Sequence, residues 1–245
     1  MPAPFGIDTI HLAPVTAPEH GFLLVTGPAG SGRSTAILSL LEALQEQGAG
    51  APIDAVLIAP RRSTLRDLPL WSEVADTADT REATINRLTR ALGGTTPTQA
   101  MALPLLPLIG TTPTPEPDTA ATPAPEPASF PALGKRGIVV VEDIGGFDGS
   151  GNEQALAALL KLLRRSDHTS IIEGESATLG TVWELASPLR GARWALALQP
   201  DANDTPSLFT TPFTHTKRAD YPPGRGFLIE NGRLTGIHIA QPENN

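Results

Sequence analysis

One stretch of the sequence constrains the fold more than any other, the segment GFLLVTGPAGSGRST at residues 21–35. Its first seven residues form a short apolar run bounded by glycine, a pattern typical of a buried strand. From Ser34 onward, apolar residues recur at helical spacing until Gly48, which predicts a helix with a glycine stop. The segment therefore predicts a strand, a glycine-rich turn and a helix in direct succession.

The turn matches the phosphate-binding loop pattern G-x-x-x-x-G-K-[ST], the P-loop, except that arginine replaces lysine. Glycines in such a turn let backbone N–H groups face phosphate oxygens, and the start of the helix adds the positive end of its dipole. A serine after the basic residue is placed to bind Mg²⁺. We expect ATP to contact the loop, with Mg²⁺ on Ser34; a glycine turn without a ligand is the alternative. The expected contact residues are Gly27, Pro28, Ala29, Gly30, Ser31, Gly32, Arg33, Ser34 and Thr35.

Arg33 is the departure from the pattern. The usual lysine is a compact point charge, whereas arginine keeps the charge on a broad planar head. Two outcomes are open: Arg33 binds phosphate in an altered pose, or it folds away and pairs with another group. Positive charge alone does not provide the in-line geometry that phosphoryl transfer needs.

A second motif follows the apolar run at 138–141, where Glu142 and Asp143 stand side by side. P-loop enzymes carry an aspartate for the Mg²⁺ shell at this point, often followed by a glutamate that polarises the attacking water. Here the order is reversed. We expect Glu142 at the metal and both acids in catalytic positions, with the shorter Asp143 falling short of the water. The alternative is a strand that ends in two solvated acids.

Most of the remaining sequence alternates between predicted strands and helices. This alternation favours an α/β domain with a mostly parallel sheet covered on both faces. An Asn-Gly pair near the end predicts a hairpin, expected as an antiparallel edge. The predicted strands are 54–60, 137–143, 169–174 and 193–199, the predicted helices are 80–94, 153–166 and 178–187, and the hairpin covers 226–240.

A proline-rich segment at 94–133 interrupts this alternation. The chain has 25 prolines, and ten of them fall between Pro97 and Pro131. Because proline lacks a backbone donor and fixes φ, we expect an extended, mostly disordered insertion there. The rest of 1–245 reads as a single domain. It starts close to its first predicted strand and ends just after its last, as expected for a domain excised from a longer protein.

Composition narrows the classes of function. The chain has no cysteine, which excludes disulfides and thiolate metal sites. Its formal net charge is −8, and nucleic-acid affinity rests largely on neutralising phosphates, so DNA is a disfavoured partner. No apolar run approaches the length of a membrane span, so we expect a cytoplasmic protein that meets a membrane only through the rest of a complex.

Five segments together resemble the FtsK/SpoIIIE class of P-loop ATPases, and more narrowly the ATPase domains of type VII secretion ATPases of the EccC type. The resemblance covers nearly the whole chain except the insertion. The P-loop alone is specific only to a superfamily, whereas the PPGRGF ending in this order and spacing points to the narrower family. The segments are PFGID with HLAPV, GFLLVTGPAGSGRST, VLIAPRRSTL, IVVVEDIGGF and PPGRGFLIENGRLTGIHIA.

The resemblance implies a RecA-like P-loop fold and assembly with neighbouring ATPase domains. Family members pump DNA or export small helical proteins. In EccC-like chains the downstream ATPase domains often have degraded nucleotide sites and regulate the first domain or bind the substrate's C-terminal signal. Arg193 matches the place where family members carry an arginine that reaches a neighbour's ATP, which makes it a further catalytic candidate; a salt-bridged arginine at a sheet edge is the alternative.

The departures at Arg33, Glu142 and Asp143 lead to one hypothesis, a degenerate ATP-binding domain. It would bind ATP and Mg²⁺ weakly or without efficient hydrolysis, and serve regulation or recognition of a secreted protein. An active ATP-driven DNA translocase domain is the main alternative. A small P-loop kinase is a third, although the insertion lacks the arginines that a kinase lid would bring to the phosphates.

Overall fold

The computed structural model describes residues 3–48, 54–94, 137–147, 149–179, 183–190, 192–204, 208–209 and 211–241. The expected insertion at 94–133 lies outside the described residues from 95 onward, so its structure stays a prediction.

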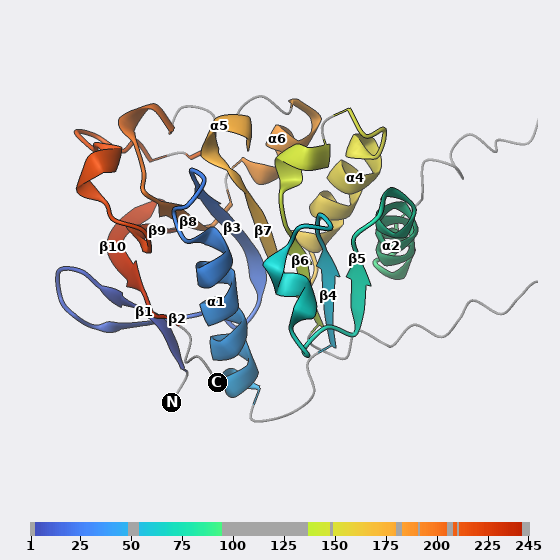
Figure 1. The fold of residues 1–245 in the computed structure, drawn as a ribbon, viewed down its shortest axis with the longest axis horizontal. Helices are drawn as coiled ribbons and strands as arrows, with labels where there is room; N and C mark the ends of the chain where they lie inside the picture. The colour runs from blue at the N-terminus through green and yellow to red at the C-terminus, as the bar shows by residue number, and fades with distance from the viewer. Residues whose placement is uncertain are drawn as a thin grey trace, which may run out of the picture.

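Within the described residues, ten strands form one sheet in the order β2-β1-β10-β9-β8-β3-β7-β6-β4-β5 (Figure 1). The six strands from β8 to β5 in this order run parallel to one another, and the other four pair antiparallel. The α/β class and the largely parallel sheet are therefore confirmed. The strands are β1 (Pro4–Asp8), β2 (Pro14–Thr16), β3 (Gly21–Gly27), β4 (Asp54–Ile58), β5 (Glu73–Ala75), β6 (Gly137–Val141), β7 (Thr169–Glu175), β8 (Trp194–Leu198), β9 (Arg225–Glu230) and β10 (Arg233–Ile239).

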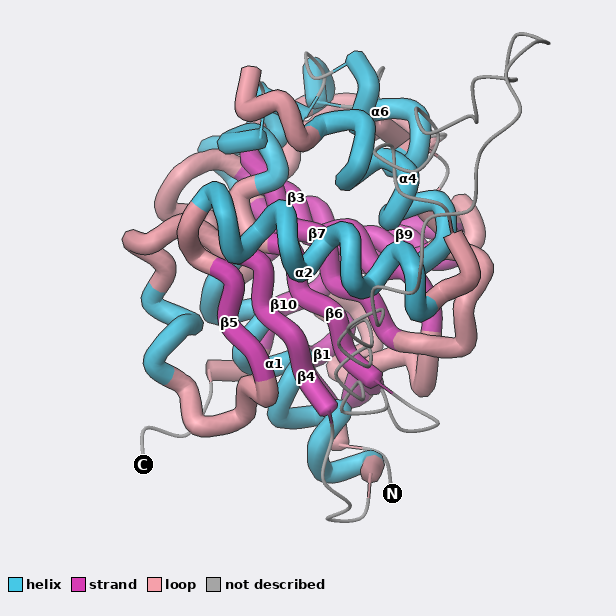
Figure 2. Tube along the Cα trace, turned by 90° about the vertical axis from the view of Figure 1, so that its right-hand side faces the viewer, coloured by secondary structure: helices cyan, strands magenta, loops and turns pink. Residues whose placement is uncertain are grey.

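Helices cover both faces of the sheet. On one face α1 packs on β1 and β3, and on the other α2, α4 and α6 share a second core (Figure 1). Figure 2 views the domain from the side on which α2 lies. None of the described helices has the length and apolar character needed to cross a membrane. The helices are α1 (Arg33–Gln47), α2 (Ala78–Ala91), α4 (Glu153–Leu163), α5 (Ser176–Leu179) and α6 (Trp183–Leu189), and the 3₁₀ turns are η1 (Thr64–Asp67), η2 (Ile144–Phe147), η3 (Ala202–Asp204) and η4 (Arg218–Asp220).

The central strands are apolar throughout because both of their faces are buried. Every residue of β6 is buried, and in β3 only Gly21 is partly exposed. Val25 and Val140 face α1, whereas Leu24 and Val141 face the opposite core. Parallel strands between two helical layers have this composition, which is why the short apolar runs were readable as strands.

Two predictions about the chain's C-terminal half are wrong. The single helix expected at 178–187 is replaced by two, α5 and α6. The hairpin of β9 and β10 is not an edge: it lies between β8 and β1, and β2 forms the edge. The reason is that the N-terminal strand β1 returns to pair with β10, a long-range contact with no local signature.

Candidate nucleotide site

The carboxyl ends of β3, β7 and β6 meet at one edge of the sheet because these neighbouring strands run parallel. The P-loop follows β3, and Glu142 and Asp143 follow β6. Open α/β sheets bind ligands in the crevice beyond the carboxyl ends of their strands. The fold thus brings together the two predicted motifs, which are far apart in the sequence.

The P-loop backbone needs its glycines. Gly30 and Gly32 have φ values of 78° and 93°, in the left-handed region that favours glycine. A Cβ on Gly27 would collide with the Oγ of Ser31 and the carbonyl oxygen of Leu198. The tight turn that the sequence predicted is therefore present.

Several hydrogen-bond donors of the loop are unused. Within the described residues, the N–H groups of Gly30, Gly32 and Ser34 donate to no protein acceptor, and α1 begins without a side-chain cap. In the same part of the chain, the fully buried Oγ of Ser31 has no partner. Free donors at the start of a long helix are suited to an anion. The backbone of the loop fits a phosphate group.

The turn of the PPGRGF motif packs on this loop. The N–H of Gly224 donates to the carbonyl of Ser31 at 2.9 Å, and the carbonyl of Gly224 accepts from Ile239 N–H at 2.8 Å. A Cβ on Gly226 would collide with the carbonyl of Ala197. The glycines of the motif therefore let the C-terminal hairpin approach both β8 and the P-loop.

The side chain of Arg33 pairs with a carboxylate of β7, and its guanidinium also contacts the first residue of the P-loop. Its Nε lies 2.8 Å from Oε1 of Glu173, and its Nη1 donates to the carbonyl of Gly27 at 3.0 Å. Of the two outcomes that the sequence left open, the structure has the second. In this position Nε and Nη1 of Arg33 are both bonded to groups of its own domain.

Glu173 is the site residue that sequence reasoning missed. It lies on β7, its side chain is 6% exposed, and its Oε2 accepts from Asp143 N–H at 2.7 Å. Burial raises the pKa of its carboxyl, opposed by the charge of Arg33 and the bond from Asp143. A carboxylate inside an apolar strand, in the run TSIIEGE, was the available signal.

Glu142 is buried rather than solvated. Its Oε2 accepts a short hydrogen bond from Ser63 Oγ, in the loop after β4. Burial raises the pKa of Glu142, and the bond from Ser63 opposes that rise. The alternative of two solvated acids is wrong for Glu142, whereas its role as a metal ligand stays a prediction.

Asp143 has a φ of 55°, and its Oδ2 lies 2.6 Å from Nη2 of Arg62. The Arg62 side chain is 81% exposed, so this is a surface pair beside the buried Arg33–Glu173 pair. Ser34 is half-buried and Thr35 is exposed in the first turn of α1. The catalytic role of Asp143 and the ligand roles of Ser34 and Thr35 stay predictions.

Arg193 lies at the opposite end of the sheet. It precedes β8, whose Trp194 pairs with Leu23, so Arg193 is level with Phe22. The five residue steps from Phe22 to Gly27 correspond to about 16 Å. Its exposed side chain lines a hollow of about 470 Å³ with His20 and Arg164. β8 is an inner strand, so Arg193 lies at the amino end of the parallel strands and not on an outer strand, and its catalytic role stays a prediction. Arg193 does not join the P-loop of its own chain.

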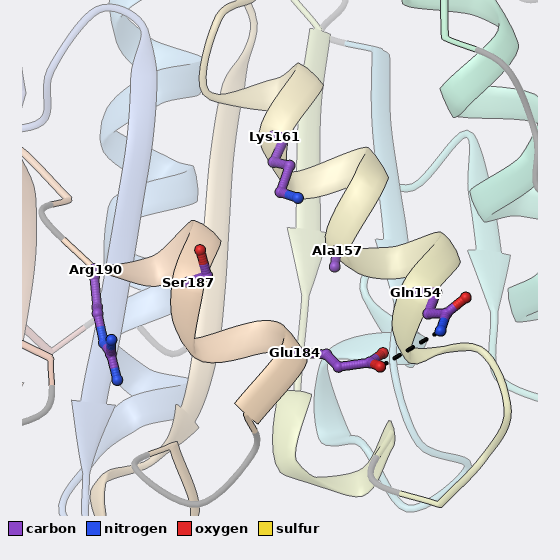
Figure 3. Close-up of a pocket in the computed structure, with 6 residues that line it drawn as sticks. All are labelled: Gln154, Ala157, Lys161, Glu184, Ser187 and Arg190. Carbon is purple, nitrogen blue, oxygen red and sulfur yellow. Dashed lines mark hydrogen bonds between the residues drawn. The ribbon is translucent and has the colours of Figure 1, made fainter.

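A second hollow, of about 460 Å³, lies between α4 and α6 (Figure 3). Three of its residues come from α4, two from α6 and one from the position just after α6, and Gln154 donates a hydrogen bond to Glu184 at 3.5 Å. Two cationic side chains, Lys161 and Arg190, and the carboxylate of Glu184 line this groove. The groove lies on the helices that cover the sheet and not at the P-loop. Its residues are Gln154, Ala157, Lys161, Glu184, Ser187 and Arg190.

Comparisons with known proteins bear on the fold. No protein-family model and no curated protein matches the chain. ATPases 2 and 3 of Thermomonospora curvata EccC, solved with a signal sequence peptide, match with a TM-score of 0.65 at 19% identity, over 98% of this chain and 40% of that one. The cytoplasmic domain of EssC matches with 0.61 at 16% identity, over 98% and 43%. VirB4 of Thermoanaerobacter pseudethanolicus matches with 0.57 at 10% identity, over 98% and 96%.

The chain spans 40% and 43% of the length of the matched EccC and EssC chains. At these identities the likeness shows a shared fold, the RecA-like P-loop fold. The resemblance to ATPase domains of the FtsK/SpoIIIE type and of EccC is therefore confirmed at the level of the fold.

Proposed function

We propose that this chain is an ATPase-type domain of a type VII-like secretion ATPase whose own nucleotide site is degenerate. It binds ATP and Mg²⁺ weakly, hydrolyses ATP inefficiently, and acts through contacts with other proteins. Its place is cytoplasmic, at the inner face of a membrane, within a larger complex.

The position of Arg33 is the single observation that carries this proposal. Its guanidinium donates to Glu173 and to the carbonyl of Gly27, both groups of its own domain. A phosphate at the P-loop would therefore meet free backbone donors but no free side-chain cation from Arg33. Phosphoryl transfer depends on such a charge to neutralise the oxygens of the transferred group.

The acidic pair supports the same proposal. Glu142 is held by Ser63, and Asp143 is paired with Arg62. Both carboxylates are engaged within the domain, and they stand in the reverse of the usual order. An arrangement of this kind favours a domain that has kept the P-loop fold for a different use.

The partners we propose are neighbouring ATPase domains and a secreted protein. The matched EccC structure holds a signal sequence peptide, and its chain contains two ATPase domains. We propose that Arg193 reaches the nucleotide of a neighbouring domain, because it is exposed and about 16 Å from its own P-loop. The formal net charge of −8 disfavours DNA as the partner.

Calorimetric titration of Mg-ATP into the purified chain tests the proposal. We expect a Kd above about 100 μM, weaker than about −5.5 kcal/mol, and no measurable phosphate release. Arg33→Lys is the matched variant and is expected to bind more tightly than the wild type. Micromolar binding by the wild type with rapid hydrolysis would contradict the proposal, and stimulation of that hydrolysis by DNA would favour a translocase.

A further inference from the structure

We propose that Glu173 is a positioning residue that holds Arg33 out of the phosphate cradle, so that nucleotide gains this arginine only when their ion pair opens. This inference rests on the proposed function, because it identifies Glu173 as the residue that makes the affinity for nucleotide weak.

The strand order places Glu173 where it can do this. β7 lies between β3, which carries the P-loop, and β6, which leads to the acidic pair. Glu173 is level with Val25 of β3, and it is two residues beyond Ile171, which belongs to the core under α1. Its carboxylate therefore lies on the face where α1 begins, between the two motifs.

Both oxygens of this carboxylate are engaged. Oε1 faces Nε of Arg33 at 2.8 Å, and Oε2 accepts from Asp143 N–H at 2.7 Å. The side chain is 6% exposed, so little water competes for it. A carboxylate fixed at both oxygens presents a single, well-defined acceptor to Arg33.

The shape of arginine suits this role better than that of lysine. The guanidinium donates from Nε to Glu173 and from Nη1 to the carbonyl of Gly27 at 3.0 Å. These two nitrogens lie in one rigid plane and point in different directions, whereas lysine has a single nitrogen on a flexible stem. The arginine of the P-loop and the buried carboxylate of β7 thus form a matched pair.

Nucleotide would have to compete with this pair. A phosphate group and Glu173 both need the same guanidinium. If Arg33 turned to the phosphate, it would leave Glu173 as a buried carboxylate without its cation, close to further negative charge. Separating a buried ion pair in this way is unfavourable, and the cost lowers the apparent affinity for nucleotide.

The test is Mg-ATP titration of Glu173→Gln, a change that keeps the size of the side chain and its acceptor for Asp143 N–H. Because the charge-assisted bond that competes with the phosphate is lost, we expect the affinity to rise roughly 10- to 100-fold, or about 1.4–2.8 kcal/mol. Glu175→Gln is the matched control: it removes the same charge two residues further along β7, and Glu175 is not paired with Arg33 in the described residues. Because Glu175 is level with Gly27 of the P-loop, this variant measures the general effect of removing a charge beside the site, and we expect a smaller gain than for Glu173→Gln.

A combined variant separates positioning from general electrostatics. In an Arg33→Met background, Glu173→Gln is expected to change the affinity no more than Glu175→Gln does. The proposal is overturned if folded Glu173→Gln binds no better than the control, or if its full gain persists without Arg33. Should Glu173→Gln fail to fold, Glu173→Asp withdraws the carboxylate by one methylene with the charge kept, and an unchanged affinity would overturn the proposal equally.

A measurement without nucleotide completes the test. The ¹H–¹⁵N signal of Arg33 Nε–H, assigned by its loss in Arg33→Lys, is expected to be protected from solvent exchange in the wild type and unprotected in Glu173→Gln. Unprotected Nε–H in the wild type would overturn the positioning role. Failure of the proposed function looks different, because the wild type would then bind Mg-ATP tightly and hydrolyse it.

Discussion

The two ends of the parallel strands differ in how their charges are used. At the carboxyl end, Arg33, Arg62 and Ser63 are all bound to acidic side chains of the same domain. At the amino end, the described residues that line the hollow beside Arg193 include two arginines and a histidine and no carboxylate. The charges at the P-loop end are paired within the domain, whereas the hollow at the opposite end is lined by the exposed residues Arg164 and Arg193.

The difference lies in how the side chains are paired and not in the architecture of the sheet, which both ends share. The backbone cradle depends on glycines and on the start of α1, and both are intact. The side chains around it are positioned by a few long-range contacts. In these contacts Arg33, Arg62 and Ser63 are bonded to acidic side chains of the same domain. If the proposed function holds, we expect a partner to bind at other surfaces, such as the amino end of the sheet or the groove between α4 and α6.

The largest effect is expected from Arg33→Met, which keeps much of the arginine stem but removes its charge. Glu173 would become a buried carboxylate without its cation, so we expect a loss of about 3 kcal/mol in the free energy of unfolding at pH 7.5. Urea denaturation measures this loss. Because burial raises the pKa of Glu173, the loss should be smaller at pH 5, where more of this carboxyl is protonated than at pH 7.5.

Arg62→Met is the matched control for that variant. Arg62 pairs with Asp143 at the surface, where its side chain is 81% exposed. Exposed pairs contribute little, so we expect a loss below about 0.5 kcal/mol. Equal losses in the two variants would contradict the distinction between a buried and a surface pair at this edge.

A pH-dependent effect is expected from Glu142→Gln. Burial and the charge of Asp143 raise the pKa of Glu142, against the bond from Ser63 and the charges of Arg33 and Arg62. A carboxyl with a raised pKa is stabilising while protonated, and that stability is lost as pH rises from the ordinary value of 4.5 through the raised one. The neutral amide should therefore stabilise the domain at pH 7.5 relative to the wild type, by up to about 1 kcal/mol.

Thermal unfolding of Glu142→Gln and wild type at pH 5 and pH 7.5 measures this effect. The advantage of the variant should shrink at pH 5, where more of the wild-type carboxyl is protonated. A larger advantage at pH 5 would show that the pKa of Glu142 is lowered and not raised.

The smallest effect on stability is expected at the amino end of the sheet. Arg193 is exposed, so Arg193→Ala should change the free energy of unfolding by less than about 0.5 kcal/mol. Urea denaturation of the single domain checks this. A loss above about 1 kcal/mol would show that Arg193 is already used within its own domain, and the contrast between the two ends would fail.

Much of the fold could be predicted from the sequence because its signals are local. The strand before Gly27 and the helix after it follow from apolar runs, helical spacing and glycines within a few residues. The acidic end of β6 was readable for the same reason. Short elements such as β5, with three residues, and the division of one expected helix into α5 and α6 carry too few residues for a period to show.

The order of the strands was not readable in the same way. Pairing of β1 with β10 joins the two ends of the chain and moves the hairpin from the edge to the interior of the sheet. Such contacts depend on which faces remain to be buried once the central strands have paired. No short segment of the sequence contains that information.

By itself the sequence determined the P-loop and its cradle, since glycines at fixed spacing dictate the backbone of a strand-to-helix turn. It also showed that arginine replaces lysine there. Only the tertiary structure decided where that arginine points, because its partner Glu173 lies on a strand far away in the sequence. The direction of a charged side chain is set by the nearest opposite charge in space, and the strand order β3-β7-β6 is what places that charge beside Arg33.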